Sequence, residues 1–229
     1  MSASIVPQLV LKDFRLHRSI ILVFALVVLL SAGLVSFLIG RIPDWVALNL
    51  GFILLLGPAA TCGIVLLMKS NVFEKEKSTQ AFIMSLPVTV REFTKAKLLL
   101  NLPVFGLFWL AVSAAGFYFA FGRGLFPLGA VPFVTMVFLG VLLSYTCILS
   151  TSLVSQSLGL TVLSIALFEM VTSAYLWTIA YLEGTRRYIW GSQIVWTPMF
   201  LAIVAAQILA AAGVIAITLH LQNRKRDFI

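Results

Sequence analysis

Long apolar runs, separated by short polar and charged segments, make up most of this chain. Three runs without a charged residue are 22 (residues 19–40), 24 (45–68) and 25 (98–122) residues long. Each is close to the roughly 20 residues that an α-helix needs to cross about 30 Å of hydrocarbon. The alternation of apolar and polar positions that a barrel strand requires is absent, and a helix bonds its backbone groups within its own segment. The pattern therefore predicts an all-α integral membrane protein.

The second half of the chain divides into three further predicted spans. Residues 124–182 hold a single charge, Glu169, and are too long for one span but fit two. The natural break is a polar cluster between Ser150 and Ser157, followed by Gly159. The six spans are then residues 19–40, 45–68, 98–121, 131–152, 158–182 and 197–221, in a single transmembrane domain covering residues 1–229.

Composition agrees with this pattern and narrows the class of protein. The chain is 61% hydrophobic and 10% charged, whereas an average soluble domain has about 25% charged residues.

No cleavable signal peptide is apparent, because the first apolar run is longer than a typical signal and lacks a clear small-x-small cleavage site. Cys62 and Cys147 both lie within predicted spans, so we interpret them as small buried residues without a disulfide or zinc framework.

The distribution of Lys and Arg predicts the orientation of the spans. If the N-terminus is cytoplasmic, twelve of the 16 Lys and Arg residues lie inside and four lie outside. The positive-inside rule therefore predicts that both termini and residues 71–97 are cytoplasmic. The net charge of +8 is then mostly a consequence of topology, and nucleic acid is not an expected partner.

Residues 4–18 are predicted to form an amphipathic helix that lies in the membrane interface before the first span. Polar residues recur on one side at helical spacing, and apolar residues face the other. An ordinary basic flank is the alternative interpretation. The polar side holds Gln8, Lys12 and Arg15, and the apolar side holds Val6, Leu9, Val10 and Phe14.

The polar segment 71–97, which we call the arm, lies between the second and third predicted spans. Eight of the chain's 24 charged residues fall between Glu74 and Lys97. Before Pro87 the arm has few helix breakers and carries apolar side chains after a charged start. This pattern predicts a short helix whose apolar side chains pack against another surface. These apolar side chains are Phe82, Ile83 and Leu86.

A second helix is expected directly after Pro87. Thr89 and Glu92 have the spacing of a capping box. In this motif the Thr hydroxyl accepts a hydrogen bond from the Glu backbone amide, and the Glu carboxylate accepts one from the Thr backbone amide. The helix would begin at Val90 and continue through Lys97 into the third span. The arm is therefore expected to be a helix, a tight proline turn and a stiff helix joined to the membrane.

At these residues the chain resembles the permease subunits of ABC-2 type transporters. In that family a cytoplasmic loop between the second and third spans has an acidic start, a Gly-Thr pair, a hydrophobic helix, Leu-Pro-Val and a basic helix. In this chain Ser78 stands before Thr79, where the family often has Gly. The matching residues are Glu74 and Glu76 for the acidic start, Leu86, Pro87 and Val88 for the turn, and Arg91, Lys95 and Lys97 for the basic helix.

The resemblance implies the transmembrane half of an ABC exporter, a multi-pass protein of the plasma (inner) membrane surrounded by membrane lipid. It implies a second permease subunit, in a homodimer or a heterodimer, and cytoplasmic ABC ATPase subunits that carry ATP and Mg²⁺. In the family the loop docks on the ATPase and passes its motion to the spans. This ATPase-coupling role carries over to Glu74, Glu76, Thr79, Phe82, Ile83, Leu86 and Pro87, with Thr89 and Glu92 as the cap of the coupling helix.

This chain is not expected to be an enzyme or to bind a cofactor itself. The sequence has no G-x-x-x-x-G-K-[ST] phosphate loop, so energy from ATP would have to come from a partner. The predicted spans hold one carboxylate and only His220 near an end, too few groups for a nucleophile with its base or for a metal site. The sequence does not distinguish between amphipathic peptides, lipids, drugs and glycan precursors as the substrate. An alternative class is a membrane anchor or sensor that recruits a cytoplasmic partner through the arm without transporting anything.

Glu169 falls near the middle of the fifth predicted span. An ionised carboxylate there costs about 2.5 kcal/mol or more, and no predicted span contains a Lys or Arg. The side chain must therefore be protonated, face water, or meet a partner from another subunit or the substrate. One hypothesis is that Glu169 lines a substrate path that favours cationic or amphipathic cargo. The other is a neutral carboxyl that bonds to Thr172, Ser173 or Gln207.

Overall fold

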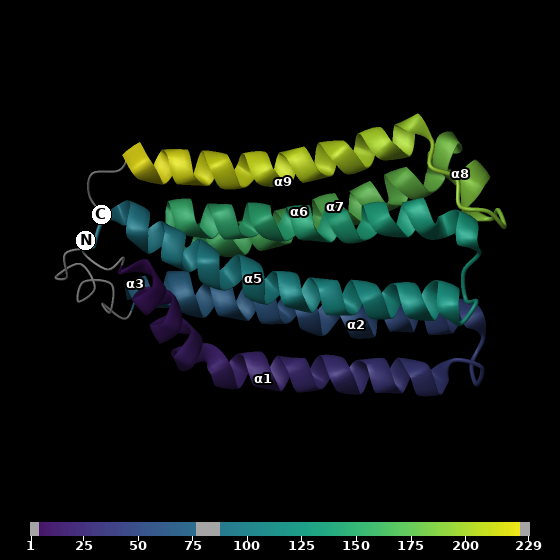
Figure 1. The fold of residues 1–229 in the computed structure, drawn as a ribbon, viewed down its shortest axis with the longest axis horizontal. Helices are drawn as coiled ribbons and strands as arrows, with labels where there is room; N and C mark the ends of the chain where they lie inside the picture. Colours follow the sequence, from purple (N-terminus) through teal and green to yellow (C-terminus); the bar gives the residue numbers. More distant parts are fainter. Residues whose placement is uncertain (1–4, 77–87, 225–229) are drawn as a thin grey trace.

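Six long helices lie side by side in the computed structural model of this chain, which describes residues 5–76 and 88–224 (Figure 1). Each is long and apolar enough to cross a membrane, and no β-strand occurs among these residues. The prediction of an all-α protein with six long apolar helices is therefore confirmed. The helices are α1 (Val6–Leu38), α2 (Asp44–Leu67), α5 (Val90–Phe117), α6 (Val131–Ser155), α7 (Leu158–Tyr181) and α9 (Pro198–Arg224).

Short helical elements extend or join the long helices. A π-helix, η1 (Met68–Val72), continues α2 and leads into α3 (Phe73–Glu76). A second π-helix, η2 (Tyr118–Gly122), continues α5, and the 3-10 helix η3 (Leu128–Ala130) leads into α6. Helix α8 (Glu183–Ile189) joins α7 to α9 at the end of the bundle opposite α3 (Figure 1). The bundle thus has an α3 end and an α8 end.

The predicted N-terminal amphipathic segment and the first predicted span form one continuous helix, α1. Its first turns lie at an angle to the rest of the helix and approach α3 (Figure 1). The buried side chains of these turns are Leu9, Asp13 and His17, which recur every four residues and so share one face. Leu9 is buried and Phe14 is 44% exposed, so the bundle covers only part of the apolar side of this segment.

The bundle has two groups of helices, with α1, α2 and α5 in one and α6, α7 and α9 in the other (Figure 1). The groups meet at a stacked ring pair, Phe105 of α5 and Tyr145 of α6, whose centroids are 3.6 Å apart. Gly63 of α2 faces both rings, which leave no room for a Cβ atom. Close packing at this glycine therefore sets how near α2 lies to α5 and α6.

The outer faces of α1, α7 and α9 are apolar and exposed. In each of these three helices the most apolar 18-residue stretch is only 11% buried. Exposed apolar surface on this scale is unusual for a soluble monomer and is typical of contact with lipid or with another subunit. The exposed side chains include Leu22, Leu29, Leu163, Met170 and Leu209.

Candidate functional site: a buried ionic cluster at the base of the arm

Four charged side chains from three helices meet where the arm joins the bundle. The Nζ atom of Lys97 lies 2.7 Å from Asp13 Oδ2 and 2.5 Å from Glu74 Oε2. The Nζ atom of Lys12 lies 2.9 Å from Asp13 Oδ1 and 3.5 Å from Glu74 Oε1. We name these four residues the ionic cluster. Its two ammonium groups and two carboxylates balance in charge.

Three members of the ionic cluster are almost completely removed from solvent. Asp13 and Lys97 are each 1% exposed, and Glu74 is 6% exposed. Removing one partner from a buried ion pair typically costs about 3–5 kcal/mol, because the other charge is left uncompensated. Each of these three charges therefore depends on the presence of the others.

Lys12 closes the cluster on its solvent side, with 43% of its side chain exposed. Burial acts to lower the pKa of Lys12. Its hydrogen bond to Asp13 and the negative charges of Asp13 and Glu74 outweigh burial, so the pKa is raised above the ordinary lysine value. Lys12 thus stays charged and neutralises the second of the two carboxylates.

Apolar packing brings α1 and the start of α5 together at the cluster. Leu9, one turn before Asp13 on α1, packs with Val88, Phe93 and Ala96 at the start of α5. Phe93 lies one turn before Lys97, and the Lys97 Nζ atom lies 5.0 Å from the centroid of the Phe93 ring, within cation–π range. The start of α5 is therefore held to α1 by apolar, aromatic and ionic contacts together.

The first turn of α5 has both hydrogen bonds of the capping box. The Glu92 amide donates to Thr89 Oγ1 at 3.2 Å, and the Thr89 amide donates to Glu92 Oε2 at 3.0 Å. The bonds from the backbone and hydroxyl of Thr89 hold the pKa of the Glu92 carboxyl below its usual range. From this cap α5 runs to Phe117 as one helix that contains Pro103, so its first turns and its apolar part belong to the same element.

A second set of buried polar side chains extends from the ionic cluster across the bundle. Asn101, one turn after Lys97, donates from Nδ2 to the Lys97 carbonyl at 2.9 Å and to the Ser70 hydroxyl at 3.1 Å. The Ser70 hydroxyl donates to Asn71 Oδ1 at 3.2 Å, and Asn71 Nδ2 donates to Ser152 Oγ at 3.4 Å. We name Ser70, Asn71, Asn101 and Ser152 the polar layer. It links η1, α5 and α6 through hydrogen bonds.

The residues assigned to ATPase coupling from the sequence fall in different places. Glu74 is buried in the ionic cluster, so its carboxylate contacts this chain and is not open to a partner surface. The backbone of Glu76 ends α3, and Thr89 with Glu92 caps α5. The other predicted residues lie outside the described part of the chain: Thr79, Phe82, Ile83, Leu86 and Pro87.

Glu169 lies midway along α7 and is exposed. It makes no hydrogen bond or ion pair with any residue that the structure describes. Two of the partners considered for a neutral carboxyl bond elsewhere, since Thr172 bonds to Ser144 and Gln207 donates to the Met136 carbonyl and to Tyr175. The Glu169 carboxyl therefore faces out of this chain's own bundle.

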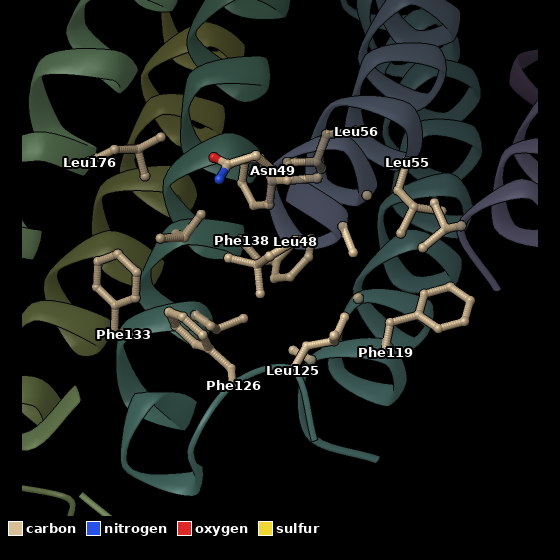
Figure 2. A pocket seen from close by; sticks show the side chains of 18 of the residues that line it. Leu48, Asn49, Leu55, Leu56, Phe119, Leu125, Phe126, Phe133, Phe138 and Leu176 are labelled. Carbon is tan, nitrogen blue, oxygen red and sulfur yellow. The ribbon is translucent and has the colours of Figure 1, made fainter. Parts of the chain in front are cut away.

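An apolar cavity of about 380 Å³ lies between the two groups of helices, near the α8 end (Figure 2). Leu55 of α2, Phe138 of α6 and Leu176 of α7 contribute to its walls, and the loop after η2 adds Leu125 and Phe126. None of its described lining residues is charged. The cavity suits an apolar group and offers little to a polar one.

Sequence reasoning did not single out Asp13 or the polar layer. One signal was available, because Asp13 is the only acidic residue among the first 43 and lies four residues from Leu9 and from His17. Comparison with protein-family models, with curated proteins and with solved structures found no match to this chain. The ionic cluster is therefore interpreted from its own geometry.

Proposed function

We propose that this chain is the transmembrane permease subunit of an ATP-driven ABC-2 type exporter. A separate cytoplasmic ATPase hydrolyses ATP, and this chain uses the resulting motion to move a substrate across the plasma membrane. The observation that carries the proposal is the ionic cluster, which ties the base of the arm to both α1 and α5. An arm fixed in this way passes a movement on to these helices and does not absorb it in a flexible linker.

In this proposal the movement enters at the arm and reaches the spans through α5. The capping box fixes the start of α5, and the helix continues past Pro103 to Phe117, so α5 can act as a lever. The polar layer then connects α5 to α6, so a movement of the arm is transmitted to both groups of helices. Buried ion pairs and hydrogen bonds favour a small number of discrete arrangements over continuous deformation, which suits a transporter that alternates between states.

The assembly in this proposal contains a second permease subunit and cytoplasmic ABC ATPase subunits, which bind ATP and Mg²⁺. The α3 end of the bundle, where α1 begins and α9 ends, faces the cytoplasm in this proposal, as the excess of Lys and Arg in the cytoplasmic segments favours. Glu169, which faces out of the bundle, lies toward the second permease subunit or the substrate path. The apolar cavity supports a cargo with an apolar part, such as a lipid, an amphipathic peptide or a drug, over a glycan.

Co-purification tests this proposal directly. The tagged chain is isolated in mild detergent from cells that naturally express it, and the bound proteins are identified and assayed for ATP hydrolysis. We expect an ATPase whose activity in proteoliposomes depends on this chain. A stable complex with a protein that hydrolyses no ATP would instead favour the anchor or sensor function. A chain that binds no ATPase, and whose transport does not respond to ATP, would overturn the proposal.

A further inference from the structure

A groove of about 970 Å³ lies beside the ionic cluster, at the α3 end of the bundle. It runs between the first turns of α1 and the junction of η1 with α3. Its basic lining residues are Lys12, Arg15 and Lys69, and its one acidic lining residue is Glu74. We name it the basic groove.

The charges that line the basic groove do not balance. Three cations face one carboxylate, which leaves an excess of two positive charges. That carboxylate, Glu74, is already engaged by Lys97 and Lys12. Arg15 and Lys69 are both exposed, and neither makes an ion pair with a carboxylate among the described residues. The groove therefore presents two cations that lack a counter-charge within the described chain.

Apolar side chains line the same groove and lead away from it along α1. Leu11 and Leu16 are 47% and 66% exposed, although both lie next to cations in the sequence. Ile20 continues this lining toward the apolar part of α1, and Phe73 contributes from α3. A soluble anion would gain nothing from these side chains. A ligand with both a phosphate and hydrocarbon chains would use the cations and the apolar surface together.

We propose that the basic groove binds an anionic phospholipid, with Arg15 and Lys69 on its phosphate and its acyl chains along Leu16 and Ile20. A guanidinium group binds phosphate oxygens in pairs, and an ammonium group adds a point charge. Clusters of Lys and Arg where a helix enters the membrane attract anionic lipids. The bound lipid lies against Lys12 and Glu74, so it braces α1 against η1 at the base of the arm. This inference does not depend on the exporter function.

Native mass spectrometry of the purified chain, in the complex with which it is isolated, tests this site. The protein is titrated with phosphatidylglycerol or with phosphatidylcholine of the same acyl chains. We expect the anionic lipid to bind about thirtyfold more tightly. The double variant Arg15→Gln/Lys69→Gln should weaken phosphatidylglycerol binding by about thirtyfold and leave phosphatidylcholine binding unchanged.

A matched control separates this site from general attraction to the basic end of the protein. Arg91→Gln/Arg224→Gln also removes two exposed cations at the α3 end, but neither residue lines the groove. It should bind phosphatidylglycerol as the wild type does. The charge-preserving variant Arg15→Lys/Lys69→Arg should retain most of the binding, and thermal unfolding without added lipid checks that all variants are folded.

Three results would overturn the proposal. The wild type binding both lipids equally would show that the groove does not select charge. Equal losses in the two Gln double variants would show that the attraction is not localised. Full competition by glycerol phosphate, which has no acyl chains, at the concentration of the lipid would assign the groove to a soluble phosphate compound.

Discussion

Lys97 decides whether two buried carboxylates can stay charged. It holds Asp13 at 2.7 Å and Glu74 at 2.5 Å while being 1% exposed itself. Lys97→Met should therefore lower the free energy of unfolding by about 3–5 kcal/mol. Lys95→Met, which removes a nearby cation outside the cluster, should change it by less than about 0.5 kcal/mol. Thermal and denaturant unfolding in detergent compare the two variants, and equal losses would contradict this account.

A rescue experiment separates the effect of charge from the effect of packing. Replacing a whole buried ionic group by neutral side chains is often tolerated, whereas removing one partner is not. The triple variant Asp13→Asn/Glu74→Gln/Lys97→Met should therefore recover at least half of the stability that Lys97→Met loses. No recovery would mean that the lysine stem, and not its charge, holds this site together.

Gly63 is a point of close packing between α2, α5 and α6. A Cβ atom there would lie 2.6 Å from Phe105 Cδ2 and 2.7 Å from Tyr145 Cε2, and the two rings are stacked on each other. We expect Gly63→Ala to cost about 1–3 kcal/mol through overpacking. Gly106→Ala is the control, because nothing lies within 4 Å of that position and the change favours helix. The midpoints of thermal unfolding check both.

At the scale of single elements, the connection of the arm to the bundle depends on the stability of the first turn of α5. Thr89 is exposed, so its role is to bond to Glu92 and not to pack. Thr89→Ala should cost about 1 kcal/mol of local stability, and Thr89→Ser should cost little. Hydrogen–deuterium exchange of the first-turn amides of α5 should then be about fivefold faster in Thr89→Ala alone. Unchanged exchange would show that tertiary contacts, and not the cap, hold this turn.

The six helices could be predicted from the sequence because a bilayer imposes a minimum apolar length, and charges mark where each run stops. The break between α6 and α7 could also be predicted, because polar residues interrupt the apolar sequence there. Ser and Gln residues cluster there, and Gln156, with a φ of 47°, ends α6. The capping box could be predicted as well, since its two residues are three apart in the chain.

The ionic cluster could not be predicted in the same way. Asp13 and Lys97 are separated by 84 residues, and hydrophobic periodicity does not say which helix lies beside which. The sequence places Lys97 on the cytoplasmic side, at the entry to the third span, but does not indicate which carboxylates lie beside it. The sequence pattern also could not show that the N-terminal segment and the first span form one helix. A change from amphipathic to uniformly apolar sequence is compatible with a continuous helix and with a broken one.

At the scale of the whole molecule, Glu169 is an exposed carboxyl midway along a long apolar helix. An exposed carboxyl in the middle of a membrane helix is costly unless something outside the chain covers it. Glu169→Gln should leave the free energy of unfolding of the isolated chain within about 0.5 kcal/mol of the wild type, because no described residue bonds to the carboxylate. If the chain is the proposed exporter subunit, the same variant should change transport in proteoliposomes, with the largest loss for cationic cargo and an altered dependence on pH.

The control for Glu169 is Glu183→Gln, the same chemical change at an exposed carboxylate on α8 outside the long apolar helices. It should leave both stability and transport as they are. If Glu169→Gln destabilises the isolated chain, the carboxyl has a structural partner within it. If it alters neither stability nor transport for any cargo at any pH, Glu169 lines no substrate path. Only a transport defect in a fully stable protein fits a carboxyl that acts between this chain and what lies against α7.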